Sequence, residues 1–364
     1  MPHGEIREPL GETGLHARCA SYSTTVAQLA RDDALDALLR EVHARPDSDD
    51  ARLVLADALL ARGDPRGELI ALQLAAPGDD RQRGRIDQLL RDHARRWLGA
   101  LRHVIYRARF ARGFLARLEL NGRWTASEQG WAEHAVDPRL ATVEDLIPGR
   151  SVGPIYARFV TSPAMTALRR IEVFDRPTLD ALRATPASLV HVSCPRWKVG
   201  KYVHELAANV LPACERFDAL RSFAVHGDGV ASVLAARLFP QLTSLTVASS
   251  LAAGLALWPR LPRAMSLTIT RSAMLEQCVT TRVAWTGALT LRRDGDDLVA
   301  HAAGDRLLGE LVEHFAALPP LRVLEVEGGD AHAAAIAEAA ARRGVELVRR
   351  PFARRTGYIA GLDK

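Results

Sequence analysis

One short segment of the chain combines basic and aromatic side chains, the types that often contact a partner. Residues 196–204 read Arg-Trp-Lys-Val-Gly-Lys-Tyr-Val-His and hold two of the chain's three lysines. Such side chains can form a hot spot for another protein, or stack on bases and contact phosphates of a nucleic acid. The alternative is an ordinary helix whose aromatic side chains pack inward. We expect partner contacts from five side chains here: Arg196, Trp197, Lys198, Lys201 and Tyr202.

A second group of residues has the types that bind metal ions. His191 and Cys194 are followed by His204 and Cys214. Their spacing matches no standard zinc site, so we expect structural roles for them and neither a bound metal nor another cofactor. Residues 294–297 (Asp-Gly-Asp-Asp) lack the glycine and glutamate positions of an EF-hand calcium loop. We interpret them as a hairpin turn with Asp-Gly at its tip.

Several sequence motifs of common enzyme classes are missing from the chain. It contains no Walker A motif and no GxGxxG or HExxH pattern. Serine, histidine and aspartate residues are scattered, so the sequence does not exclude a catalytic triad assembled by folding. We expect a protein that is not an enzyme, and an enzyme of unrecognised type stays as an alternative.

The composition is that of a globular protein with a basic balance. Of 364 residues, 48% are hydrophobic and 25% are charged, and the net charge is +5. A basic protein can bind nucleic acid, but only three of the 48 basic residues are lysines and acidic residues are interspersed among them. An arginine-rich skew of this kind is typical of a GC-rich genome. Nucleic acid is therefore a less favoured partner than protein.

Cysteine usage and hydropathy indicate a cellular compartment. The four cysteines form no CxxC pair, so neither a disulfide framework nor a zinc ribbon is predicted. No N-terminal run has the n-region and h-region of a signal peptide, and no stretch approaches 18 apolar residues without charge. We expect a cytoplasmic protein that does not insert into a membrane.

The N-terminal part of the chain has helical periodicity. After residues 1–31, which we expect to be a flexible leader, apolar residues recur at helical spacing in four segments. Asp64 and Pro65 supply an N-cap and a proline at the first helical position, and Gly63 suits the C′ position of the helix before them. We predict a helical domain over residues 32–108.

From residue 109 onward, short apolar runs of strand length replace the helices. The predicted strands cover residues 114–120, 168–173, 189–192, 220–225, 242–247, 265–269, 288–291, 321–326 and 345–348. Apolar residues also predict helices over 307–315 and 331–343, which suit the opposite side of such a sheet.

The spacing between these runs is the strongest repeat signal in the chain. Phe223, Leu245, Leu267 and Leu289 follow one another at steps of 22 residues. A leucine-rich repeat spans about 20–29 residues. Two longer gaps, of 33 and 35 residues, leave open either a longer unit with a full helix or a decayed repeat. We predict an α/β fold for residues 109–364: an irregular leucine-rich-repeat-like solenoid with parallel strands on its concave face, helices or turns on its convex face, and a C-terminal cap.

Four runs at the N-terminal side carry a family pattern: residues 46–57 (PDSDDARLVLAD), 62–73 (RGDPRGELIALQ), 93–101 (HARRWLGAL) and 110–114 (FARGF). Together they make residues 35–120 resemble the repeat-companion domain found beside leucine-rich repeats in some large-genome bacteria. The chain departs from that pattern at Leu55, Ala58 and Leu69, where the family commonly has Tyr, Trp and Phe. The resemblance implies a helical module ahead of repeats and no established catalysis.

A solenoid of this kind would present the polar residues that flank its buried strand positions. We expect Arg221, Thr243, Thr246, Arg322 and Glu325 to contact the partner. The expected function is a non-catalytic protein–protein interaction or scaffold module of a bacterial system, with a partner encoded nearby. A nucleic-acid-binding protein using residues 196–204 is the first alternative, and an enzyme the second.

Overall fold

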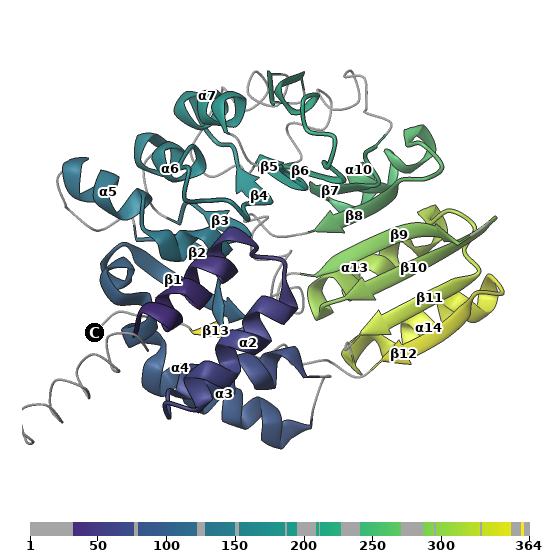
Figure 1. The fold of residues 1–364 in the computed structure, drawn as a ribbon. Helices are drawn as coiled ribbons and strands as arrows, with labels where there is room; N and C mark the ends of the chain where they lie inside the picture. The colour runs from purple at the N-terminus through teal and green to yellow at the C-terminus, as the bar shows by residue number, and fades with distance from the viewer. Residues whose placement is uncertain are drawn as a thin grey trace, which may run out of the picture.

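A group of helices and one long mixed β-sheet make up the part of the chain that the structure describes (Figure 1). The structure is a computed structural model. It describes residues 32–75, 79–121, 128–149, 153–185, 188–194, 209–210, 212–226, 241–270, 287–294, 296–327, 330–350 and 358–359. The predicted leader and residues 196–204 lie outside these ranges.

The N-terminal helices begin with a segment over residues 32–44. It is followed by α2 (Asp49–Leu60), α3 (Pro65–Leu74), α4 (Asp80–Leu98) and the 3₁₀ helix η1 (Gly99–His103). Local chemistry sets the α2–α3 boundary as predicted. Gly63 has a φ of +69°, and the N–H groups of Gly63 and Asp64 donate to the carbonyls of Leu60 and Leu59, a Schellman pattern. Asp64 then caps α3 by accepting from the Arg66 N–H, with Pro65 in the first turn.

Among the described residues, thirteen strands form the sheet, and nine of them overlap strands predicted from apolar runs. The four that were not predicted are β1, β3, β10 and β13. The strands are β1 (Ile105–Ala111), β2 (Phe114–Leu120), β3 (Asp145–Ile147), β4 (Arg170–Glu172), β5 (His191–Cys194), β6 (Ser222–His226), β7 (Ser244–Ala248), β8 (Ser266–Thr270), β9 (Ala288–Asp294), β10 (Asp297–Ala303), β11 (Val323–Glu327), β12 (Glu346–Arg350) and the two-residue β13 (Tyr358–Ile359).

The strands follow their sequence order across the sheet from β1 to β12, with β13 added beside β1. Neighbours from β2 to β8 are parallel, as are β10–β11 and β11–β12. The prediction of parallel strands throughout is wrong at four contacts, because β1–β2, β1–β13, β8–β9 and β9–β10 are antiparallel. The hairpin expected at residues 294–297 is confirmed, since Asp294 pairs with Asp297 where β9 turns into β10.

The 22-residue period corresponds to strand register only in part. Phe223, Leu245 and Leu267 pair in succession across β6, β7 and β8. Leu289 pairs instead with Ile269, because β9 runs antiparallel to β8 and reverses the order of its residues. The equal step to Leu289 is therefore a coincidence of spacing rather than a fourth equivalent position.

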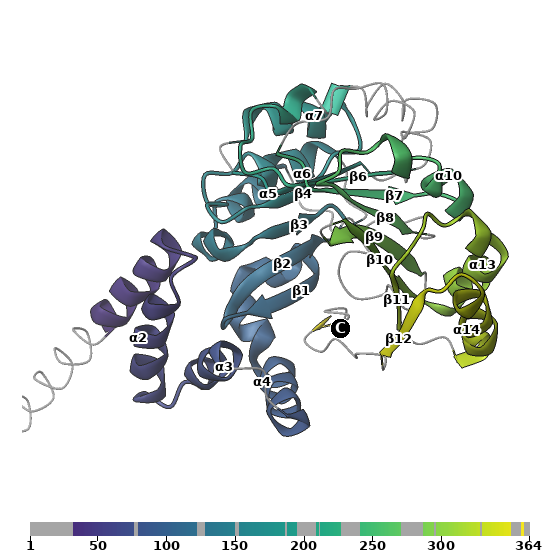
Figure 2. The same cartoon turned by 90° about the vertical axis from the view of Figure 1, so that its right-hand side faces the viewer.

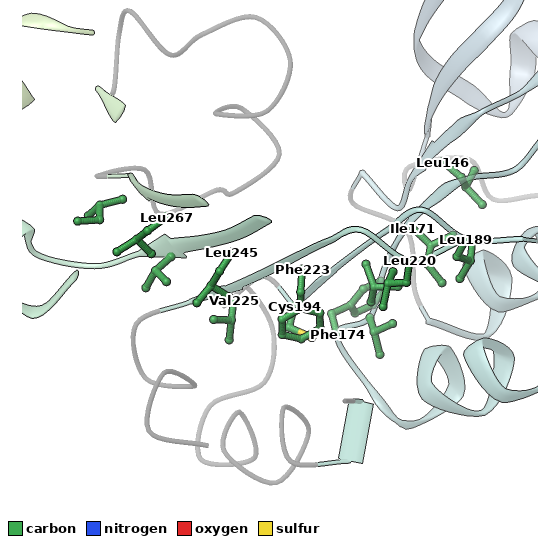
Figure 3. Close-up of a cluster of buried hydrophobic side chains, with 14 of the residues drawn as sticks. Leu146, Ile171, Phe174, Leu189, Cys194, Leu220, Phe223, Val225, Leu245 and Leu267 are labelled. Carbon is green, nitrogen blue, oxygen red and sulfur yellow. The ribbon is translucent and has the colours of Figure 1, made fainter. Parts of the chain in front are cut away.

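Alternation along each strand gives the sheet two different faces. On the core face, Leu146, Ile171, Phe223, Leu245 and Leu267 are at most 2% exposed. Figure 3 shows these side chains gathered on one side of successive strands. They belong to one apolar cluster that continues from Leu69 in α3 to Val345 near the C-terminal end. We call the opposite side the polar face.

Helices cover the core face on the outer side of the sheet (Figures 1 and 2). The predicted helices over 307–315 and 331–343 are confirmed as α13 with η6 and as α14. The elements on this side are α5 (Glu128–Ala135), η2 (Pro138–Thr142), α6 (Gly153–Val160), α7 (Arg176–Ala184), α10 (Leu251–Leu255), η5 (Trp258–Arg260), α13 (Asp305–His314), η6 (Phe315–Ala317), η7 (Asp330–His332) and α14 (Ala333–Arg342).

Chain length requires the sheet to bend. β12 and β13 lie at opposite edges, although only residues 351–357 separate them in sequence. Eight residue steps reach at most about 29 Å, whereas twelve steps between neighbouring strands would cover about 58 Å on a flat sheet. The two edges must therefore approach each other, and Figure 2 shows the sheet as an arch with the helices outside.

The helical region is joined to the sheet by polar contacts as well as by the core. Arg66 Nε donates to the Gly113 carbonyl at 3.1 Å, and Gln73 Oε1 accepts from the Gly113 N–H at 2.7 Å. Both side chains come from α3, in the run RGDPRGELIALQ, and Gly113 is in the turn of the β1–β2 hairpin. The expected boundary between residues 108 and 109 falls inside β1, which begins at Ile105.

Candidate interaction surface

The polar face carries continuous rows of side chains that cross the sheet in register. The first row runs from Arg109 on β1 through Arg117, Asp145, Arg170, His191, Ser222 and Ser244 to Ser266 on β8. The second row contains Arg107, Glu119, Ile147, Glu172, Ser193, Ala224, Thr246, Thr268, Thr290, His301 and Glu325, so Ile147 and Ala224 interrupt its polar side chains. These side chains point away from the aliphatic core because they alternate with it along every strand.

Charged side chains gather at the N-terminal end of this face, over β1 to β4. Arg117 Nη1 lies 3.3 Å from Asp145 Oδ2, and Arg107 Nη1 lies 3.6 Å from Glu119 Oε2. Arg117 is only 3% exposed, whereas Arg170 is exposed. The pKa of the half-buried Arg109 is lowered mainly by burial, with further lowering from Arg117 and Arg170 and opposition from Asp145 and Glu144. This end of the face is therefore a concentrated positive region that is only partly neutralised.

Hydroxyl groups replace the charges over β6 to β9. Ser222, Ser244 and Ser266 are adjacent in the first row and all half-buried. In the second row Thr268 Oγ1 and Thr290 Oγ1 are 3.0 Å apart and hydrogen-bonded. This stretch offers short donors and acceptors without net charge, which suits contacts with a polar partner surface.

His191 stands between the charged and hydroxyl parts. Its Nδ1 is 2.9 Å from Ser222 Oγ. Burial, with a smaller contribution from Arg170, lowers the pKa of His191 to about 4, so the ring is neutral at pH 7. Cys194 lies on the core face of the same strand, since it is three residues away. The two side chains cannot bind one metal ion, and the described residues contain no cluster of three or more metal-binding side chains.

The sequence-predicted contact residues are dispersed rather than gathered. Arg196, Trp197, Lys198, Lys201 and Tyr202 all lie outside the described residues. Arg221 and Thr243 are exposed but precede β6 and β7, where they bond to nearby backbone: Arg221 Nη1 donates to the Asp218 carbonyl, and Thr243 Oγ1 donates to the Arg221 carbonyl. Both residues lie outside the two rows of the polar face.

Three further predicted residues can be placed. Thr246 is on the polar face, but it is only 7% exposed, so the expectation that it is presented to a partner is corrected. Glu325 is on the same face and accepts a 2.9 Å hydrogen bond from Arg350. Arg322 is exposed beside the β9–β10 hairpin, with Nε 2.7 Å from Asp297 Oδ2. Local partners occupy both of these charged side chains.

Sequence reasoning missed Arg109, Arg117, Asp145 and Arg170. It predicted neither β1 nor the three-residue β3, and without them these side chains have no common row. A usable signal exists in the charged alternation Arg107-Ala-Arg109 and Arg117-Leu-Glu119, the period of a strand with one polar face. The pairing of the strands nevertheless had to be known before the row could be assembled.

An open hollow of about 380 Å³ lies away from this region, lined by Arg263, Ala264, Arg293 and Asp296. A second, of about 10 Å³, lies among Arg66, Trp97, Phe110, Phe114 and their neighbours and has room for a single water molecule. Neither brings together a nucleophile and a base.

No protein-family model matches the chain, and no curated protein matches it. Within the described ranges, none of the helices combines the length and the apolar character needed to cross a bilayer.

Proposed function

We propose that the chain is a non-catalytic protein-binding scaffold that engages its partner through the polar face of the arch. The observation that carries this proposal is the division of the sheet: one face is filled by an aliphatic core, and the other carries two mostly polar rows, of which the longer reaches from β1 to β11 and includes both buried and accessible side chains. A face of this length is suited to an extended partner surface rather than to a small molecule.

We further propose that the sheet is an irregular leucine-rich-repeat-like solenoid with a repeat-companion module at its N-terminal side. The sequential strand order and the 22-residue register across β6, β7 and β8 support this reading. The antiparallel hairpin of β9 and β10 makes the array irregular. A repeat unit cannot bury its apolar face alone, so stacked neighbours share one core. A cytoplasmic location agrees with the unpaired, buried thiols of Cys194 and Cys214.

Two charge-matched double variants test the binding face. Ser244→Arg with Thr268→Arg adds two charges to the polar face, where both side chains are half-buried. Ala252→Arg with Ala253→Arg adds the same two charges on exposed positions of α10, on the outer side. Each protein, and the unmodified chain, serves as bait for affinity capture from native lysate, with thermal unfolding to confirm that each variant folds.

The unmodified chain and the α10 variant should both retain a stoichiometric protein partner that the polar-face variant loses. Capture of that partner by all three proteins would overturn the assignment of the polar face. A failure to recover any protein partner across several lysates and salt concentrations would overturn the scaffold proposal itself.

A further inference from the structure

Arginines oppose one another across adjacent strands at the charged end of the polar face. Arg109 on β1 pairs directly with Arg117 on β2, and Arg117 is in turn in register with Asp145 on β3. Arg170 on β4 follows Asp145. We call these four residues the arginine row. Like charges directly opposite each other destabilise a sheet, so the row needs more negative charge than one aspartate supplies.

The neighbouring carboxylates are too few to neutralise the arginines. In the next row Arg107 pairs with Glu119 at 3.6 Å, and Glu172 adds one buried carboxylate. Four arginines therefore face three carboxylates on this part of the sheet. Glu144, which precedes β3, forms an ion pair with Arg112 at 2.6 Å. This pair is therefore left out of the comparison of charges.

Arg117 is the arginine that lacks hydrogen-bond acceptors. Its side chain is 4% exposed, and its Nε and Nη1 atoms find no hydrogen-bond acceptor among the described residues. Nη1 is close enough to Asp145 Oδ2 for ion pairing, at 3.3 Å, but lacks hydrogen-bond geometry. A buried charged donor without an acceptor is costly, and an added oxyanion would satisfy it.

The exposed end of the arginine row gives a ligand access toward the Arg117 guanidinium. Arg170 is exposed, Arg109 is half-buried and Arg117 is buried. Asp145 lies between Arg117 and Arg170, with a side chain 13% exposed. Burial lowers the pKa of Arg109; Asp145 and Glu144 oppose this shift, and Arg117 and Arg170 add to it.

We propose that the arginine row binds an oxyanion, the phosphate or carboxylate group of a ligand, between the guanidinium groups of Arg109, Arg117 and Arg170. A guanidinium presents parallel N–H donors that match two oxygens of either group. Asp145 competes with the ligand for the same donors and thereby limits its affinity. The site is argued from its own contacts and does not depend on the protein-binding proposal.

The test uses the full chain and two small probes, inorganic phosphate and succinate, each compared with sodium chloride at equal ionic strength. Binding to the folded protein raises the melting temperature as probe concentration exceeds the dissociation constant, and we expect a rise of about 2 °C or more at saturating probe. Phosphate alone, succinate alone or both can give this rise, and the probe that does so identifies the ligand group. Shifts no larger than those in sodium chloride would overturn the proposal.

Variants then locate the site. Because Arg170 is exposed, the Arg170→Gln variant should fold. We expect it to bind the probe about tenfold more weakly, because one charge-assisted contact is lost. Arg109→Gln should weaken binding similarly. Arg350→Gln is the matched control, because Arg350 belongs to the opposite end of the sheet and pairs with Glu325. Binding that is unaffected by both Arg109→Gln and Arg170→Gln would overturn the assignment.

Asp145→Asn should change the affinity for the probe in the opposite direction from the arginine variants. Removing the competing carboxylate should make the probe bind more tightly, although the protein without the probe is less stable. A purely structural row would lose stability with no gain in affinity for the probe, and unchanged or weaker probe binding in this variant would contradict the proposal.

Discussion

Arg66 Nε donates a 3.1 Å hydrogen bond to the backbone carbonyl of Gly113, 47 positions further along the chain. The same guanidinium lies over the ring of Phe114, with Cζ 4.2 Å from the ring centroid. Burial lowers the pKa of Arg66 to about 10, and the nearby Asp64 carboxylate opposes this shift. One side chain thus connects α3 to the hairpin with which the sheet begins.

Replacement of Arg66 should loosen this connection. Arg66→Lys keeps the charge but loses the donor geometry at the Gly113 carbonyl, and we expect a loss of about 2 kcal/mol in the free energy of unfolding. Urea denaturation measures it. Arg176→Ala is the control, since Arg176 pairs with Asp180 in an exposed i,i+4 bridge and should change stability by less than about 0.5 kcal/mol. Equal losses in the two variants would contradict the proposed role of Arg66.

Two glycines in helices should respond in opposite directions to alanine. A Cβ at Gly67 in α3 would lie 2.7 Å from the Ala56 carbonyl oxygen and 2.8 Å from the Leu60 nitrogen, both in α2. Gly67→Ala should therefore force the helices apart and destabilise the protein by about 2 kcal/mol. A Cβ at Gly84 in α4 meets nothing within 4 Å, so Gly84→Ala should stabilise by about 0.5–1 kcal/mol. Thermal unfolding compares them, and the same sign for both would refute the close approach of α2 and α3.

Acid should weaken the fold through His191. Its folded-state pKa is lowered from 6.5 to about 4, mainly by burial, so the unfolded chain binds the proton more readily. Stability is retained above pH 6.5 and is lost as pH falls toward 4, with about 2 kcal/mol lost between pH 7 and pH 5. Urea unfolding at both pH values checks this, and His191→Asn should reduce the difference. Part of it should remain, because burial also lowers the pKa of His43 and His134. A pH dependence identical in the variant would exclude His191 as a source.

The sequence by itself determined the local elements whose signals are short-range. Gly63, Asp64 and Pro65 specify the α2–α3 boundary through backbone conformation and capping. Runs such as 220–225 and 242–247 predicted β6 and β7 because one buried position follows another at a period of two. Spacing also gave the register across β6, β7 and β8.

Only the tertiary structure decided strand direction and the make-up of the arginine row. A 22-residue step from Leu267 to Leu289 is compatible with parallel or antiparallel pairing, since spacing does not specify which way a strand runs. Arg117 and Arg170 are 53 positions apart in the chain, and the three-residue β3 between them has too few residues to show a period. Their charges act on each other because backbone hydrogen bonds hold β2, β3 and β4 about 4.8 Å apart, a proximity that no local pattern encodes.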